Sequence, residues 1–179
     1  MPKPSRLSAL FRSAWSAITR PAPPAAPRET PATRPEEAAP GRFGPGATVE
    51  VDPRRLRGVR VAYAPEDDER PDPGEVVWTW VPYEENDGRG KDRPVVVLAA
   101  SASDPEVFLA AQLTSQPHPG EADYLELGPG PWDAKGRSSW VDLGRILLVH
   151  SGGMRREASA VDRRRYELVA AAVRERYGW

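Results

Sequence analysis

Arg93 is the residue of this sequence whose type and position most clearly favour a chemical role. It follows a polar loop and stands directly before Pro94, which opens an apolar run to residue 100. On the other side of the loop, the alternation over residues 74–81 predicts a second strand. An arginine held at the mouth of a strand presents a planar fork of donors that matches phosphate oxygens. The pattern therefore predicts a phosphate-binding site beside a mobile loop.

The chain contains no cysteine, which excludes disulfides, thiolate catalysis and cysteine–zinc sites. Its two histidines, His118 and His150, lie 32 positions apart and do not match a metal-ligand spacing. We therefore expect no metal site and no cofactor. No apolar run approaches the roughly 20 residues that cross a bilayer, and we expect a cytoplasmic protein.

Charge is distributed unevenly along the chain. The 179 residues have a formal net charge of −1, but residues 72–179 carry 13 basic and 17 acidic side chains, a net charge of −4. A domain with this charge should not bind phosphate backbones indiscriminately. A nucleic-acid function would have to depend on a local basic patch.

The first 46 residues differ in composition from the rest. Within residues 1–20, the segment 5–19 has an apolar stripe at helical period between arginines and serines. Such a basic amphipathic helix could make peripheral contact with an anionic membrane, dock on its own domain, or have no stable structure. Residues 21–46 contain eight of the 21 prolines and are predicted to be a disordered Pro/Ala-rich linker.

Residues 47–72 are predicted to form a short strand pair and an acidic loop. Val49 and Val51 alternate with charged residues, and the alternation returns over residues 59–63. The acidic run 66–69, which is followed by prolines, is most simply a solvated loop.

Residues 73–179 carry the pattern of a compact core. Apolar runs separated by Gly and Pro clusters predict strands over residues 76–81, 95–100, 107–113, 124–127, 139–143 and 145–149. Short strands this close in sequence favour a small, strongly curved sheet or barrel. Asp162 is a good N-cap for a C-terminal helix that Gly178 ends, and Val161 can pack on Tyr166 as a hydrophobic staple. The fold class is thus mainly β with a C-terminal α-helix.

Three motifs in this order resemble those of the MazF/PemK family of toxins. They are Gly74-Glu75-Val76-Val77-Trp78, the loop ending in Arg93-Pro94-Val95-Val96-Val97, and Leu113-Thr114-Ser115-Gln116. The resemblance covers about residues 72–176. It implies an SH3-like barrel, a homodimer, metal-independent cleavage of single-stranded RNA, and a cognate antitoxin that covers the RNA groove. It also implies catalytic roles for Arg93 and Thr114.

The candidate residues can be compared with the requirements of metal-independent RNA cleavage. Metal-free cleavage can use the neighbouring 2′-hydroxyl as nucleophile, and it needs orientation, charge stabilisation and proton handling. Arg93 suits stabilisation of the transition state, while Thr114 with Ser115 would hold a phosphate oxygen. Glu85, followed by Asn86, resembles the family's acid–amide pair and is the candidate base, although it lies further from Arg93 than the usual spacing.

Further candidates for RNA contact are Arg89, Lys91, Gln116 and Arg145. Arg89 and Lys91 can equally be solvated loop charges, and Arg145 can instead pair with Asp142. Four of the six tryptophans bear on base stacking: Trp78 and Trp80 alternate within a strand and are expected in the core, whereas Trp132 and Trp140 lie near turns and are stacking candidates. A non-catalytic SH3-like module that binds RNA or protein is the alternative function.

Overall fold

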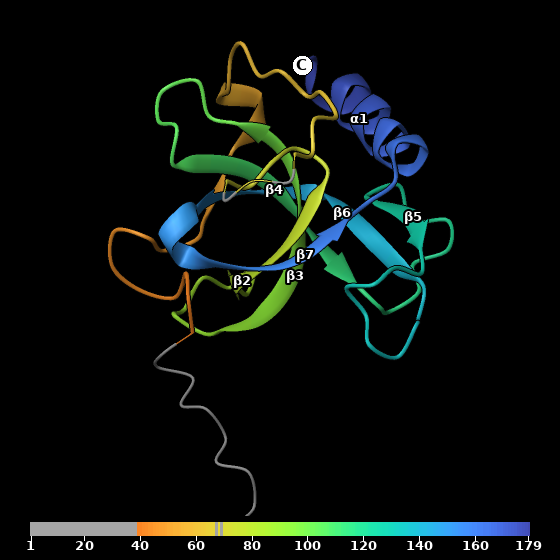
Figure 1. Cartoon of the computed structure of the whole chain (residues 1–179), viewed down its shortest axis with the longest axis horizontal. Helices are drawn as coiled ribbons and strands as arrows, with labels where there is room; N and C mark the ends of the chain where they lie inside the picture. Colours follow the sequence, from red (N-terminus) through yellow and green to blue (C-terminus); the bar gives the residue numbers. More distant parts are fainter. Residues whose placement is uncertain (1–38, 67, 69) are drawn as a thin grey trace, which may run out of the picture. The chain divides into compact units, whose positions relative to one another are not determined.

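A computed structural model describes residues 39–179, except residues 67 and 69. The predicted N-terminal helix and most of the predicted linker lie outside these residues. The described chain forms seven strands, two short 3-10 helices and one α-helix (Figure 1). In order these are β1 (Val49–Val51), η2 (Pro53–Arg55), β2 (Glu75–Pro82), β3 (Gly90–Ala100), β4 (Val107–Thr114), β5 (Tyr124–Gly128), β6 (Ser139–His150), η3 (Ser151–Gly153), β7 (Met154–Ala160) and α1 (Arg163–Tyr177).

The strands form one antiparallel sheet in the order β1-β6-β4-β3-β2-β7, with β5 paired to the other end of β6. The pairing register shifts within β3–β4, β4–β6 and β2–β7. Such irregularities bend strands and increase their twist, so the sheet curls on itself. The prediction of a mainly β fold with a C-terminal helix is confirmed.

Two hydrophobic clusters occupy the two faces of the curled sheet. One includes Val77, Val95, Phe108 and Leu147 and contains no residue of α1. The other includes Val96, Leu98 and Ile146 and packs against α1. The alternation of Val76 and Val77 between the two clusters follows from the period-two geometry of a strand. Buried side chains on both faces explain why residues 95–99 are apolar without interruption.

Helix α1 begins and ends where the sequence predicts. The Asp162 carboxylate accepts a hydrogen bond from the Arg165 amide at 3.0 Å, and Gly178 ends the helix with a positive φ of 72°. Val161 and Tyr166 are both buried, as the staple requires.

A segment before β1 is tied to β2 by hydrogen bonds, and β2 is tied in the same way to the turn before β7. The Trp80 amide donates to the Pro40 carbonyl at 3.0 Å, and the Thr48 amide donates to the Gly41 carbonyl at 2.7 Å. The buried Thr79 hydroxyl lies 2.6 Å from that of Thr48 and donates to the Gly153 carbonyl at 2.7 Å. Residues 40–46, which were expected to belong to the linker, therefore contact the barrel.

Three strand predictions need correction. Residues 59–63 are not a strand, because Val61 and the Tyr63 ring pack against the helix-side cluster without a pairing partner. Residues 139–150 form one strand rather than two, since β6 runs through Gly144 although its pairing register with β4 shifts there. Strand β7 was missed because its residues are mostly charged or small.

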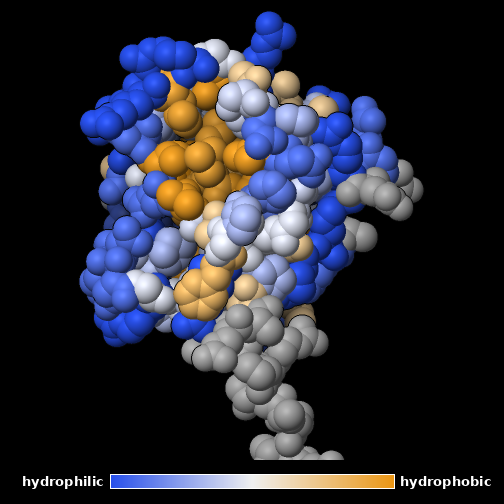
Figure 2. Space-filling model, turned by 90° about the vertical axis from the view of Figure 1, so that its left-hand side faces the viewer, coloured by the Kyte–Doolittle hydropathy of each residue, from blue (hydrophilic) through white to orange (hydrophobic). Residues whose placement is uncertain are grey.

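One face of the molecule carries a group of hydrophobic side chains surrounded by hydrophilic ones (Figure 2). The exposed large hydrophobic residues of the described chain are Phe43, Val49 and Leu168. Among the helices of residues 39–179, none is long and apolar enough to span a membrane. The predicted membrane contact through residues 5–19 lies outside the described residues.

Candidate functional site

Arg93 and Thr114 lie side by side on neighbouring strands. In the β3–β4 ladder Val97 pairs with Ala110 and Val95 with Gln112. The same register, continued by two residues, places Arg93 of β3 opposite Thr114 of β4. Since side chains alternate along a strand, Arg93 and Thr114 point to the same face as Gln112.

Both residues line a cleft of about 400 Å³, which we call the Arg93 cleft. The end of β2 and the following loop form one wall, β3 and β4 the floor, and the β4–β5 loop the other wall. Its lining residues are Pro82, Tyr83, Glu84, Glu85, Arg89, Arg93, Gln112, Thr114, Gln116, His118, Tyr124 and Arg145. Six of the eight predicted site residues are thus brought together, although they span 61 positions of the sequence.

The Arg93 guanidinium is half-buried and available for a ligand. Within the described residues it makes no ion pair and no hydrogen bond. The neighbouring Asp92 does not neutralise it, because that carboxylate is held by Arg155 of β7 at 2.7 Å. A half-buried cation without a carboxylate partner favours an anionic ligand.

Thr114 has a hydroxyl that is oriented by its own turn. Its Oγ1 accepts a hydrogen bond from the Gln116 amide at 3.1 Å. With the oxygen engaged as an acceptor, the hydroxyl hydrogen is left to donate to a ligand oxygen. An arginine and a hydroxyl donor on adjacent strands are the kinds of group that bind a tetrahedral oxyanion.

Lys91 and Ser115 lie on the other side of Arg93. They line a smaller hollow of about 170 Å³, which also borders Arg93 and Thr114. The Trp78 indole nitrogen, at the same hollow, is buried without a hydrogen-bond partner among the described residues. The two hollows meet at Arg93 and Thr114, as an extended ligand crossing this pair would require.

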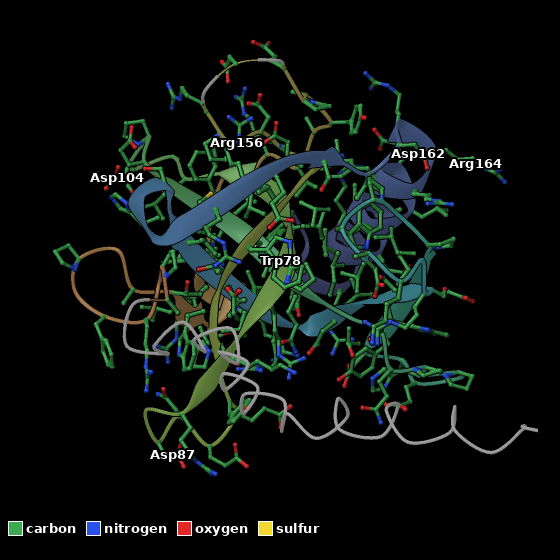
Figure 3. The ribbon with its side chains drawn as sticks, turned by 60° about the horizontal axis from the view of Figure 1, so that its bottom comes forward. Trp78, Asp87, Asp104, Arg156, Asp162 and Arg164 are labelled. Carbon is green, nitrogen blue, oxygen red and sulfur yellow. The ribbon has the colours of Figure 1, made fainter. Side chains whose placement is uncertain are left out.

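The β2–β3 loop carries Arg89 and Glu85. The Tyr83 amide donates to the Arg89 carbonyl at 3.0 Å, which extends the hairpin, and Asp87 lies at its tip (Figure 3). The Arg89 backbone amide, followed by its side chain, lowers the pKa of Asp87 by hydrogen bonding. Arg89 therefore shares its charge with Asp87, whereas Glu85 is exposed and has no hydrogen-bond partner in the described chain.

Arg145 is a structural clamp in this arrangement. Its Nε and Nη2 atoms donate to Glu50 Oε2 of β1 at 2.9 and 2.6 Å, and Nη2 also donates to the Pro82 carbonyl at 2.9 Å. The alternative that Arg145 pairs with Asp142 is wrong, because Asp142 accepts from Gln112 Nε2 and the Gly144 amide instead. Arg145 thus ties β6 to β1 and to the start of the β2–β3 loop.

Replacement of Arg145 by methionine should lower the free energy of unfolding by about 1–2 kcal/mol, because the Pro82 carbonyl loses its partner. Urea denaturation would measure this loss, and amide hydrogen exchange should show faster opening of residues 82–90. Unchanged stability together with weaker RNA binding would contradict the clamp and favour a direct contact with RNA.

Gln112, His118 and Tyr124 line the cleft but were not predicted as site residues, and Asp142 contacts Gln112. Gln112 is 8% exposed, and its Oε1 has no partner among the described residues. Asp142, 3% exposed, holds the other end of this amide at 2.7 Å. His118 and Tyr124 stack face to face on the β4–β5 side, and burial, followed by the charge of Asp142, raises the pKa of Tyr124. The Pro-His-Pro run around His118 was the available sequence signal.

The two stacking candidates differ in exposure. Trp132 is 4% exposed, and its indole N–H donates to Ser139 Oγ at 3.0 Å, so it is a core residue rather than a stacking platform. Trp140 is half-buried and lies opposite Thr114, and its role in base stacking stays a prediction. The expected burial of Trp80 is confirmed, whereas Trp78 is only half-buried.

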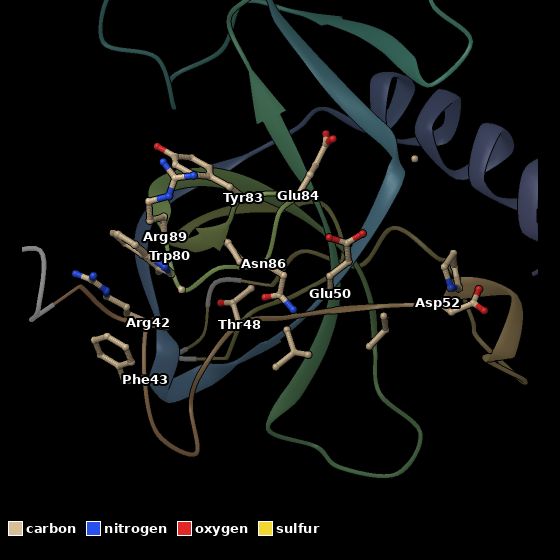
Figure 4. A pocket seen from close by; sticks show the side chains of 16 residues that line it. Arg42, Phe43, Thr48, Glu50, Asp52, Trp80, Tyr83, Glu84, Asn86 and Arg89 are labelled. Atoms are coloured by element: carbon tan, nitrogen blue, oxygen red, sulfur yellow. The ribbon is translucent and has the colours of Figure 1, made fainter.

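A larger hollow of about 690 Å³ adjoins the Arg93 cleft across Tyr83 and Arg89. Figure 4 shows Arg42 between Trp80 and Phe43, and its guanidinium lies 4.4 and 4.9 Å from their ring centroids. Three carboxylates also line this hollow: Glu50, Asp52 and Glu84. Arg42, which lines this hollow, lies against two aromatic rings, whereas Arg93 in the smaller cleft has no ion pair within the described residues, so the Arg93 cleft is the better candidate for an anion.

Within residues 39–179, apart from 67 and 69, no three His, Asp or Glu side chains lie close enough together to hold a metal ion.

Comparison with known proteins agrees with the order of the motifs. The model of the family described as "PemK-like, MazF-like toxin of type II toxin-antitoxin system" matches residues 72–176. Among solved structures, a chain of the MazE-MazF complex from Deinococcus radiodurans is similar, with 24% sequence identity and a TM-score of 0.40. The match covers 60% of this chain and 92% of that chain. No curated protein sequence matches.

Proposed function

Because the chain belongs to the PemK/MazF family of toxins of type II toxin-antitoxin systems, we propose that it is an endoribonuclease that cleaves single-stranded RNA without a metal ion. The observation that carries this proposal is the meeting of Arg93 and Thr114 at one cleft. Arg93 has no ion-pair partner in the described chain, and the Thr114 hydroxyl is free to donate.

The chemistry proceeds by attack of the RNA 2′-oxygen on the adjacent phosphorus. The phosphorane that forms gains negative charge on its non-bridging oxygens. Arg93 would donate to these oxygens through two parallel N–H groups, and Thr114 would donate from the neighbouring strand. The products are a 2′,3′-cyclic phosphate and a 5′-hydroxyl.

Other residues would hold the flanking RNA. Lys91 and Ser115 at the smaller hollow suit the phosphate on one side of the scissile bond, and Arg89 with Gln116 suits the other side. The unpaired Gln112 Oε1 is a buried acceptor that a hydroxyl or amino group of the substrate could satisfy. These assignments extend the role of the Arg93 cleft from one phosphate to a short stretch of RNA.

Membership of the toxin family also suggests which proteins this chain binds. We propose a cognate antitoxin that covers the Arg93 cleft, and a homodimer of the toxin. The hydrophobic group on one face is consistent with a protein partner (Figure 2). Light scattering of the purified chain would give the mass of a dimer, and a monomer at micromolar concentration would contradict it.

Cleavage of a labelled single-stranded RNA in the presence of EDTA tests the proposed function. Thr114→Val should reduce the rate by about 10- to 100-fold, because it keeps the shape but removes a donor to the phosphorane. Thr114→Ser is the matched control and should retain most activity, because it restores a hydroxyl. Product analysis should find the cyclic phosphate.

Two outcomes would count against this proposal. Intact RNA after incubation with the folded wild-type chain would exclude the nuclease activity under those conditions. RNA binding that is insensitive to Thr114→Val and gives no cyclic product would favour the alternative function, a non-catalytic SH3-like module. The exposed Glu84 and Glu85 in the cleft motivate that alternative, because they oppose a phosphate.

A further inference from the structure

His118 is held rigidly at the rim of the Arg93 cleft. It lies in the loop after β4 between Pro117 and Pro119, whose rings fix their own φ angles and restrict the residue before each. The loop is further tied by hydrogen bonds from the Glu121 amide to the His118 carbonyl at 3.3 Å and from the Tyr124 amide to the Glu121 carbonyl at 3.1 Å. A side chain on this loop can therefore be positioned as well as one on a strand.

The imidazole ring itself is oriented by two neighbours. It stacks on the Tyr124 ring with 3.6 Å between centroids and 3° between planes, and it packs edge-to-face with the Trp140 ring at 6.5 Å between centroids. Its Nδ1 atom lies 3.1 Å from Glu121 Oε1. A carboxylate beside Nδ1 favours the tautomer with hydrogen on Nδ1, which leaves the lone pair on Nε2. The ring is fixed in position, and one nitrogen is ready to accept a proton.

The His118 ring lies in the same cleft as Arg93 and Thr114, the two groups that would hold the phosphate. His118, Arg93 and Thr114 all line the Arg93 cleft, and the His118 side chain is 16% exposed. The orienting carboxylate, Glu121, lies beside Nδ1 and is not a lining residue of the cleft. A carboxylate, an imidazole and a bound substrate in this order form the arrangement by which an imidazole is oriented as a general base.

We propose that His118 is a catalytic base of the RNA cleavage, an inference that rests on the proposed function. Nε2 accepts the proton of the 2′-hydroxyl as the bond between the 2′-oxygen and phosphorus forms. The bond between phosphorus and the 5′-oxygen breaks, and the leaving oxygen takes a proton from water. The imidazolium then returns its proton to solvent, so the cycle consumes no oxidant, metal or co-reactant other than water.

This assignment differs from the prediction that Glu85 is the base. Glu85 lies on the exposed loop and has no partner that would orient it in the described chain. Imidazoles exchange protons near neutral pH, where a carboxylate is a weak base. Glu85 can still contact RNA, but orientation and base strength both favour the histidine.

Several charged and titratable groups face the ring. They are Glu121 beside it, Glu84 and Glu85 across the cleft, and the arginines Arg93, Arg145 and Arg89. Tyr124 stacks on the ring, and burial raises the pKa of Tyr124 further above the ordinary tyrosine value near 10, so its phenol is neutral near pH 7. The buried Asp142 lies opposite Tyr124 on β6.

Four variants test the inference. His118→Phe keeps an aromatic ring for the stack on Tyr124 but removes both nitrogens, and it should lower kcat/KM by about 100-fold or more. Glu121→Gln leaves the ring in place and should give a smaller loss of about 10-fold. His118→Ala should regain part of its activity when imidazole is added. His150→Gln is the matched control, because His150 ends β6 and does not line the cleft.

Two further measurements separate a base from a structural role. The wild-type kcat/KM should rise with pH along a limb of unit slope that His118→Phe lacks. RNA with 2′-O-methyl groups cannot be cleaved, and its dissociation constant should differ by less than about threefold between the wild type and His118→Phe.

Three results would overturn the assignment. An active wild type whose His118→Phe variant keeps its rate and pH profile removes the histidine from the mechanism and leaves the proposed function standing. A rate loss matched by an equal loss of affinity, without imidazole rescue, would make His118 a binding residue. A folded wild type that does not cleave RNA overturns both proposals.

Discussion

Replacement of Arg93 by alanine is expected to reduce RNA cleavage about 1000-fold, because it removes the charged donor closest to the proposed phosphorane. The stability of the protein should hardly change. In the described chain the guanidinium makes no ion pair or hydrogen bond, so its loss leaves no buried partner unsatisfied. Initial rates with a fluorescent single-stranded RNA, together with thermal denaturation, would measure both quantities.

Two control variants sharpen this prediction. Arg93→Lys keeps the positive charge but loses the planar fork, and its activity should lie between wild type and Arg93→Ala. Arg164→Ala removes an exposed arginine that projects from α1 and makes no ion pair within the described residues, so it should retain full activity (Figure 3). Equal activity of Arg93→Ala and Arg164→Ala would contradict a role for Arg93 in cleavage.

Replacement of Tyr166 by alanine is expected to lower the free energy of unfolding by about 3–5 kcal/mol. This ring is fully buried between α1 and the sheet, and its hydroxyl donates to the Leu98 carbonyl at 2.6 Å. Tyr166→Phe isolates the hydrogen bond and should cost about 1–2 kcal/mol, since the carbonyl is left without that donor. Urea denaturation followed by tryptophan fluorescence would measure both. Equal losses for the two variants would contradict the packing argument.

The same residue should make stability fall at high pH. Burial raises the pKa of Tyr166, so the folded state keeps the phenolic proton to higher pH than the unfolded chain does. This contribution is fully present below about pH 10, the ordinary tyrosine value, and is lost as pH rises above it. The difference in free energy of unfolding between wild type and Tyr166→Phe should therefore narrow above pH 10. A constant difference between pH 8 and 11 would contradict this linkage.

The elements that the sequence predicts well are those whose signal is local. Uninterrupted apolar residues at 95–99 and the alternation around Trp80 depend only on the environment of each strand, and both strands formed as expected. The helix depends on Asp162 and Gly178 at its ends, which act through hydrogen bonds with residues within four positions. The order of Arg93 and Thr114 in the chain likewise sufficed to suggest the family.

Strand β7 shows where local pattern is insufficient. Arg155 and Arg156 interrupt any apolar alternation, but each is neutralised by a carboxylate far away in sequence. Arg155 pairs with Asp92 and Arg156 with Glu75, at separations of 63 and 81 positions. A charged strand is stable here because its partners are supplied by neighbouring strands, and no window along the sequence contains both members of a pair.

The sequence by itself determined strands β2, β3 and β4, the terminal helix and the choice of Arg93 and Thr114 as candidates, because side-chain periodicity and capping are encoded within a few residues. Only the tertiary structure decided that Arg145 binds Glu50, that Trp132 is buried, and that His118 faces the same cleft as Arg93. These outcomes depend on the pairing register and the curl of the sheet. The register is determined by many weak contacts between distant segments, so it cannot be predicted from the sequence of any one segment.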